Sequence, residues 1–197
     1  MATDSIRLSG RPRVEELEGR ILEATQDLLI ETSYSGTTIA AVADRAHCGK
    51  SAIYRRWETK VDLIVAAVRA SQVASEAPDT GSLRGDLLAA ASHFTGSDGR
   101  SGRVLASMLT AIGTDPDLYE AAYRDVGQPP VRALIEVIER WIARGLVPST
   151  VPVALVAGIV PTAAFGSVVL RKRDLDPAEL LELVDFVVLP ALRHPPA

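Results

Sequence analysis

Residues 38–63 read TIAAVADRAHCGKSAIYRRWETKVDL, and this stretch decides the fold class. Thr38 is of a residue type that accepts hydrogen bonds from the free amides of a first helical turn. Apolar residues then recur at helical spacing, at Ile39, Val42, Ala43 and Ala46. The pattern stops at residues 47–49 and resumes with Ala52, Ile53 and Trp57. Two short helices joined by a three-residue turn form a helix-turn-helix unit, whose second helix can enter the major groove of DNA.

The second helix of this unit, which contains Ile53 and is the third helix of the chain, is polar and cationic on its outer side. Opposite Ile53 and Trp57, which we expect in the core, lie Lys50, Ser51, Tyr54, Arg55 and Arg56. Five cationic residues and one acidic residue fall between Arg45 and Lys60, although the 197-residue chain has a formal net charge of −4. Because nucleic acid responds to the local charge of a surface rather than to the total, this patch favours DNA as a partner.

Helices are also predicted on both sides of this unit. Before it, apolar residues follow steps of three and four from Val14 to Leu28, and the pattern ends within residues 32–36. After it, Thr59 and Asp62 have the spacing of a capping box, which predicts a fourth helix. The apolar face of that helix comprises Leu63, Ile64, Ala67 and Val68.

Several offsets in this stretch together resemble the N-terminal domain of the TetR family of transcriptional repressors. In that domain a Thr opens the second helix, and a Lys opens the fourth. The third ends with a Leu-Tyr or Ile-Tyr pair that is followed by two residues and an aromatic residue. These features fall here on Thr38, Ile53, Tyr54, Trp57 and Lys60. The resemblance covers roughly Val14 to Val68 and implies a sequence-specific DNA-binding regulator, which we expect to be a repressor.

The turn departs from the family pattern. Where the family usually has Gly-Val-Ser, this chain has His47, Cys48 and Gly49. His47 takes the place of a glycine whose backbone commonly needs a positive φ, so we expect some strain there. Gly49 replaces the serine cap of the third helix. Cys48 is either a small buried residue or, beside a helix N-terminus and Lys50, a thiol open to oxidation.

The resemblance also implies which side chains contact DNA. Positions where the family contacts phosphates are taken here by Thr38, Tyr54 and Lys60. Residues that could face the major groove are Lys50, Ser51, Ala52 and Arg55, and Arg56 could serve either group. Arg11 and Arg13 precede the first predicted helix and belong either to a basic arm for the minor groove or to a solvated tail.

Length and composition bound the domain organisation. The single cysteine excludes an internal disulfide framework and a multi-cysteine metal site. No apolar stretch of the kind found in secretory signals opens the chain, so we expect a cytoplasmic protein. We expect four parts: a basic N-terminal arm (1–13), a helix-turn-helix domain (14–60), a connecting helix and link (61–80), and a ligand-binding and dimerisation domain (81–197).

Beyond residue 80 the apolar patterns are all helical, so we predict an all-α fold. Apolar stripes occupy residues 105–112 and 134–142, and Asp-Pro pairs at 115–116 and 176–177 have the chemistry of helix starts. The glycines within residues 96–102 predict a loop.

A stretch without charged residues extends from Arg144 to Arg171. Its length makes a membrane span an alternative, because a span needs about 20 mostly apolar residues. Its prolines and small residues favour instead a helix at 153–170 that is buried or lies at a subunit interface. Operators are commonly read by symmetric dimers, so we expect residues 153–170 and 177–192 to form a four-helix bundle with a second copy. Relatives in the TetR family also dimerise there.

The C-terminal part, residues 115–192, also resembles the ligand-binding domains attached to TetR-type DNA-binding domains. We call such a DNA-binding domain a reader. A ligand that prefers one arrangement of a dimer would change the spacing of its two readers. Residues that could wall a pocket for a small, mostly apolar effector are Phe94, Met108, Tyr119, Tyr123, Trp141 and Phe165. For each of them, packing in the core is the alternative.

An enzyme is not expected. The histidines are scattered along the chain, and neither a nucleophile elbow nor a phosphate-binding glycine loop occurs. We therefore expect no catalytic residue, no cofactor and no metal. The alternative to a DNA-binding regulator is a helical adaptor that binds only protein. Salt would distinguish the two, because DNA affinity falls steeply as ionic strength rises.

Overall fold

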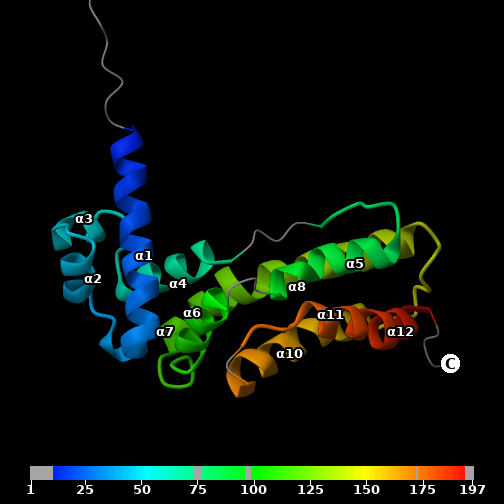
Figure 1. Ribbon diagram of the computed structural model, residues 1–197. Coiled ribbons are helices and arrows are strands. Elements are labelled where there is room, and N and C mark those ends of the chain that lie inside the picture. The colour runs from blue at the N-terminus through cyan, green and yellow to red at the C-terminus, as the bar shows by residue number, and fades with distance from the viewer. Residues whose placement is uncertain (1–10, 73–76, 96–98, 172, 194–197) are drawn as a thin grey trace, which may run out of the picture.

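The computed structural model describes residues 11–72, 77–95, 99–171 and 173–193, with side chains from residue 15 onward. Within these ranges every regular element is a helix, which confirms the prediction of an all-α fold (Figure 1). A small N-terminal group of helices lies at one end of a longer helical body, and the long first helix stands across that end.

The N-terminal group contains four helices: α1 (Arg11–Gly36), α2 (Ile39–Arg45), α3 (Lys50–Tyr54) and α4 (Lys60–Ala70). α1 begins three residues before the expected start at Val14, so Arg11 and Arg13 belong to its first turn rather than to an extended arm. Residues 1–10 lie outside the described residues. The buried core of this group, which we call the reader core, comprises Ile21, Ala24, Leu28, Val42, Ala43, Ala46, Ile53, Trp57 and Leu63.

The helix starts in this group follow the local chemistry that the sequence predicted. The Thr38 side chain accepts a 3.2 Å hydrogen bond from the Ala41 amide at the start of α2. At the start of α4, Thr59 and Asp62 form the expected reciprocal capping box. These caps satisfy amides that the helices leave free, so each helix begins where its cap lies.

The longer body contains the remaining helices. They are α5 (Leu83–Ala91), η1 (Ser92–Phe94), α6 (Arg100–Leu109), α7 (Pro116–Ala122), η2 (Tyr123–Gly127), α8 (Gln128–Ala143), α9 (Val153–Ala157), α10 (Ile159–Gly166), η3 (Ser167–Arg171), α11 (Pro177–Leu183), η4 (Val184–Val188) and α12 (Leu189–Arg193). Asp115 and Asp176 cap α7 and α11 as predicted.

Two elements of this body differ from the sequence-based expectation. α5 was not predicted, because its inward side includes the polar, fully buried Asp86 and small residues that blur the apolar stripe. Residues 96–98 of the predicted glycine loop lie outside the described residues, and Gly102 lies buried in α6, which begins at Arg100, rather than in a loop. A side chain at Gly102 would collide with the carboxylate of Asp174, so this glycine serves close packing rather than flexibility.

Two further cores hold the body together. The first lies between the pair α5 and α8 and the segments 153–164 and 180–192, which pack beneath that pair (Figure 1). The second joins the body to the N-terminal group, because Leu29 of α1 and Ile64 of α4 pack there with Val104, Met108 and Leu118. The N-terminal group is therefore attached to the body through a shared apolar core rather than by a linker alone.

The uncharged stretch forms a helical segment, Val153–Arg171, with a mean hydropathy of 2.2. By length and composition it is the one helix among the described residues that could span a membrane. One third of it is buried inside the body. Phe165 and Leu170 on this segment are exposed, as are Phe186 and Val187 on η4.

Candidate nucleic-acid interface

α3 presents its polar residues on the outside of the N-terminal group. α2 and α3 lie on the side of α1 that faces away from the longer body (Figure 1). Lys50, Ser51, Tyr54 and Arg55 are exposed. Ile53 and Trp57, at 0% and 9% exposure, fill the reader core as predicted. The geometry thus leaves a cationic helix face open to a large partner.

Two residues that were expected to contact DNA, Ala52 and Arg56, instead make contacts within the protein. Ala52 is only 7% exposed and packs inward, which corrects the expectation that it faces a groove. The Arg56 guanidinium donates a 3.0 Å hydrogen bond to the Ala52 carbonyl and lies 3.9 Å from the Glu18 carboxylate. Arg56 therefore closes the end of α3 against α1. Ala52 lies beside the buried Ile53 on the inner side of α3, whereas Arg56 follows the end of α3 and turns back onto its last turn.

The turn between α2 and α3 has the strained backbone that the sequence predicted. His47 has φ 51°, in the left-handed region. The amide of Cys48 donates a 3.0 Å hydrogen bond to the Ala43 carbonyl and helps to hold this turn. Cys48 is half-buried and packs against the reader core. Gly49 begins α3 without a side-chain cap.

The two remaining phosphate candidates differ in their surroundings. Thr38 is exposed beside the amide that it caps. Lys60 is half-buried, because its Nζ donates a 2.6 Å hydrogen bond to the Tyr34 carbonyl and lies 4.1 Å from the centroid of the Tyr34 ring. Burial lowers the pKa of Lys60, while the nearby Asp115 carboxylate opposes this shift. In this structure Lys60 ties α4 to the end of α1.

The six residues expected to wall an effector pocket do not gather around one cavity. Tyr119 and Tyr123 are 48% and 54% exposed and stack on one another, and Phe165 is 49% exposed. Met108 belongs to the core shared with α1 and α4. Phe94 packs against the core beneath α5 and α8, where Trp141 is buried. Aromatic residue type alone did not distinguish a pocket wall from a core or surface position.

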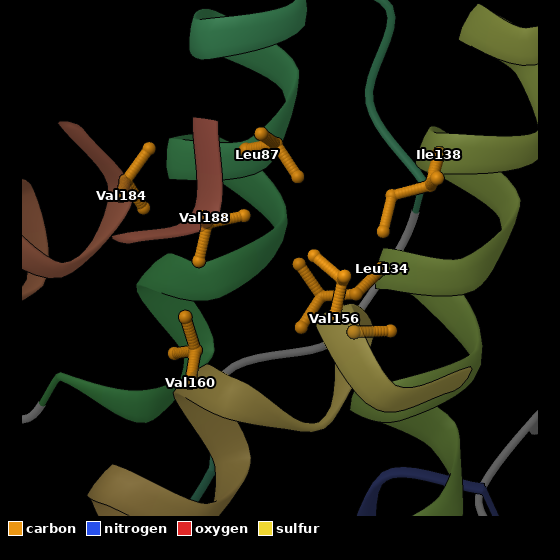
Figure 2. Close-up of a pocket in the computed structure, with 8 residues that line it drawn as sticks. Leu87, Leu134, Ile138, Val156, Val160, Val184 and Val188 are labelled. Atoms are coloured by element: carbon orange, nitrogen blue, oxygen red, sulfur yellow. The ribbon is translucent and has the colours of Figure 1, made fainter. Parts of the chain in front are cut away.

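The body does enclose a small cavity of about 10 Å³, comparable to one water molecule. Its walls are aliphatic and come from α5, α8, α9, α10 and η4 (Figure 2): Leu87, Leu134, Ile138, Val156, Ala157, Val160, Val184 and Val188. Sequence reasoning placed Leu134 and Ile138 on an apolar stripe but had no means of identifying the helices opposite them. The cavity lies between the α5–α8 pair and the two segments expected to dimerise.

An open groove of about 590 Å³ follows the outside of those two segments. Leu170, Phe186 and Val187 form its apolar wall, while Arg171, Glu179 and Glu182 form its polar rim. Arg173 donates to Glu179 at 2.7 Å, and this bond lowers the pKa of Glu179 to about 2. The groove is therefore an apolar strip bordered by charged residues, as in many subunit interfaces.

Groups of three or more histidine, cysteine or carboxylate side chains placed to hold a metal do not occur among the described residues.

Two family models match the chain. "Bacterial regulatory proteins, tetR family" matches residues 21–67, and "Tetracyclin repressor-like, C-terminal domain" matches residues 77–187. The first match contains the helix-turn-helix unit. The second covers more than half of the chain, including every residue that lines the groove and all residues of the cavity wall except Val188.

Curated relatives and solved structures agree with these matches. The HTH-type transcriptional regulator YdeS of Bacillus subtilis is 30% identical over 138 residues, 69% of this chain and 70% of that protein. The DNA-binding transcriptional repressor TetR of Mycobacteroides abscessus is 29% identical over 188 residues, 92% of this chain and 96% of that protein. NalD of Pseudomonas aeruginosa, the secondary repressor of the MexAB-OprM multidrug efflux pump, has the same fold, with a TM-score of 0.70 and 18% identity. That match covers 94% of this chain and 100% of NalD.

Proposed function

The chain belongs to the TetR family of DNA-binding transcriptional regulators, and from this premise we propose that it is a repressor released from its operator by a small, mostly apolar ligand. The family is a class of regulators rather than of enzymes. The observation that carries the proposal is the exposed cationic face of α3, held outward by the buried Ile53 and Trp57.

We assign the DNA contacts by exposure. Lys50, Ser51 and Arg55 project from α3 and would read base edges in the major groove, where a bidentate Arg or Lys contact to guanine favours the correct base by about 1–3 kcal/mol. Thr38 and Tyr54 flank this face and would bind phosphates. Lys60 would reach a phosphate only after leaving the Tyr34 carbonyl. Arg11 and Arg13 would lie near the DNA as part of the first turn of α1.

We assign dimerisation to residues 153–170 and 177–192. An operator with two half-sites needs two recognition helices about 34–36 Å apart, which one copy of this chain does not provide. The apolar wall of the 590 Å³ groove supplies a surface for a second copy. Covering it would also bury Leu170 of the Val153–Arg171 segment, so the high hydropathy of that segment is consistent with a cytoplasmic dimer on a palindromic operator.

We place the effector at the aliphatic cavity between the α5–α8 pair and the dimerisation segments. At about 10 Å³ the cavity is closed to anything larger than water, so a ligand must separate the two layers to enter. Because one of those layers is the dimerisation surface, a ligand there would prefer a different arrangement of the dimer. Only such a difference in affinity between arrangements can release DNA.

Selection from a library of randomised DNA duplexes tests the DNA-binding part of this proposal. We expect enrichment of a palindromic site, with an affinity that falls steeply between about 50 and 200 mM salt. A protein-binding adaptor would enrich no duplex. Titration of the enriched complex with a set of small apolar compounds then tests release. A ligand that releases wild-type protein should act more weakly on Leu134→Phe, which fills the cavity, than on the exposed control Leu146→Phe.

A further inference from the structure

Tyr34 joins three helices of two different domains. It lies near the end of α1, and its hydroxyl donates a 2.5 Å hydrogen bond to the Asp115 carboxylate, the cap of α7. Its backbone carbonyl accepts the 2.6 Å hydrogen bond from Lys60, the first residue of α4. The Lys60 ammonium also lies over its ring. One side chain thus connects α1 and α4 of the reader with α7 of the body.

The backbone just before Tyr34 is strained. Ser33 has φ 60° and ψ −178°, a conformation that is essentially confined to glycine. Thr37 donates to the Ser33 carbonyl through both its amide, at 3.2 Å, and its hydroxyl, at 2.8 Å. The bonds of Tyr34 to Asp115 and Lys60 hold the other side of the kink. A strained conformation persists only where its surroundings fix it, and here the surroundings include the body.

Asp115 couples this kink to the start of α7 in the body. Its Oδ1 accepts the Leu118 amide at 3.1 Å and so fixes the first turn of α7, while its Oδ2 accepts the Tyr34 hydroxyl. Leu118 is fully buried in the core that α7 shares with α1 and α4. A shift of the start of α7 therefore changes the Tyr34 bond directly.

We infer that Tyr34 is a positioning residue for operator binding, which acts through Asp115 to fix the angle between the reader and the body. The inference rests on the DNA-binding function and goes beyond it, since Tyr34 lies away from the exposed face of α3. In a dimer this angle sets the distance between the two recognition helices. The bond should therefore restrict which half-site spacing the protein accepts, without changing how one reader binds one half-site.

Tyr34→Phe removes the hydroxyl and leaves the ring beside Lys60. The matched control is Tyr119→Phe, the same chemical change at an exposed tyrosine of α7. The probes are a duplex selected with the wild-type protein, the same duplex with one base pair removed from or added to its centre, and an isolated half-site. Binding is measured by fluorescence anisotropy, and the urea midpoint of each protein is measured in parallel.

We expect Tyr34→Phe to bind the selected spacing about fivefold or more weakly than wild type, a loss typical of coupling between sites. Its preference for that spacing over the altered ones should shrink by the same factor. Its affinity for the half-site and the salt dependence should stay unchanged. Tyr119→Phe should behave as wild type. Asp115→Ala should shrink the spacing preference in the same way. Tyr34→Phe should cause no further change when it is made in the Asp115→Ala protein, as expected for two partners of one bond.

An unchanged spacing profile in Tyr34→Phe would overturn the positioning role while DNA binding stands. A uniform loss that includes the half-site would also overturn it, because that result marks a general loss of folded protein, which the urea midpoint would register. Failure to enrich any duplex with wild-type protein would overturn both the DNA-binding function and this inference.

Discussion

The indole Nε1 of Trp141 donates a 2.7 Å hydrogen bond to the Asp86 carboxylate, and the two residues are 7% and 0% exposed. The other carboxylate oxygen accepts the hydroxyl and the amide of Thr80, at 2.7 and 2.5 Å. Burial favours a raised pKa for Asp86, but the bonds from Thr80 and Trp141 outweigh it and lower the pKa. This buried carboxylate ties α5 to α8 and to the segment that leads into α5.

The Trp141 bond should contribute measurably to stability. Trp141→Phe leaves a buried carboxylate oxygen without its donor, so we expect the free energy of unfolding to fall by about 1–3 kcal/mol in urea denaturation. Trp57→Phe is the control, because its indole has no hydrogen-bond partner among the described residues and the same ring volume is lost. If both variants lose the same free energy of unfolding, the hydrogen bond contributes nothing beyond the packing of the ring.

Relief of backbone strain should raise stability. Ser33→Gly places glycine in a conformation that costs other residues about 1–3 kcal/mol, so we expect a net gain of about 1 kcal/mol after the larger entropy of the unfolded chain is counted. Ser35→Gly removes the same 3.2 Å hydroxyl contact between the two serines without relieving strain, and it should lower stability. A gain in stability in both variants would show that relief of backbone strain at Ser33 is not the cause.

The bond from Tyr34 should also be visible in acid titration. The Tyr34 hydroxyl lowers the pKa of Asp115, with help from the Leu118 amide. Because the folded pKa lies below the ordinary value of 3.8, the stabilisation is complete above that pH and is lost as the pH falls through the folded pKa. In Tyr34→Phe the Asp115 midpoint, followed by carbon NMR of labelled aspartate, should move up toward 3.8. An unmoved midpoint would exclude the hydroxyl as the cause.

A charge in the groove should separate the subunits. Phe186 is 78% exposed in the structure and would be buried by a second copy. Phe186→Asp should therefore weaken dimerisation by about 2–4 kcal/mol, measured by sedimentation equilibrium, and should weaken operator binding with it. Leu146→Asp, at a position 64% exposed outside the groove, should leave the dimer intact. A dimer that survives Phe186→Asp would place the interface elsewhere.

Loss of one side chain that contacts the major groove of DNA should affect the recognition of one base pair. Arg55→Ala should weaken binding to the selected duplex by about 1–3 kcal/mol and relax selectivity at a single position of each half-site. Arg132→Ala removes the same charge from an exposed position on α8 and should leave that selectivity unchanged. A loss that is equal for all sequences would instead mark Arg55 as a phosphate contact.

The local parts of the reader were predictable from sequence. Thr38 and the pair Thr59 and Asp62 determine where two helices begin, and Ile53 and Trp57 determine which side of α3 is buried. Each of these features depends on residues within one or two helical turns of each other, so side-chain spacing is sufficient. The positive φ of His47 was implied by the family resemblance, which places a glycine at this position of the turn, and it is confirmed.

Distant partners decided the rest. Tyr34 and Asp115 are 81 positions apart, and Asp86 and Trp141 are 55 apart, so no periodicity in the chain relates them. Trp141 and Tyr119 are both aromatic residues on helices, yet one is buried against a carboxylate and the other is exposed. The sequence by itself determined the helices, their caps and the outward side of α3, because these follow from contacts between near neighbours. The position of the cavity, the burial of the Asp86 carboxylate and the contacts between the body and the reader were decided only by the packing of α5, α7 and α8 against their partners. Burial depends on what the rest of the chain places opposite each residue.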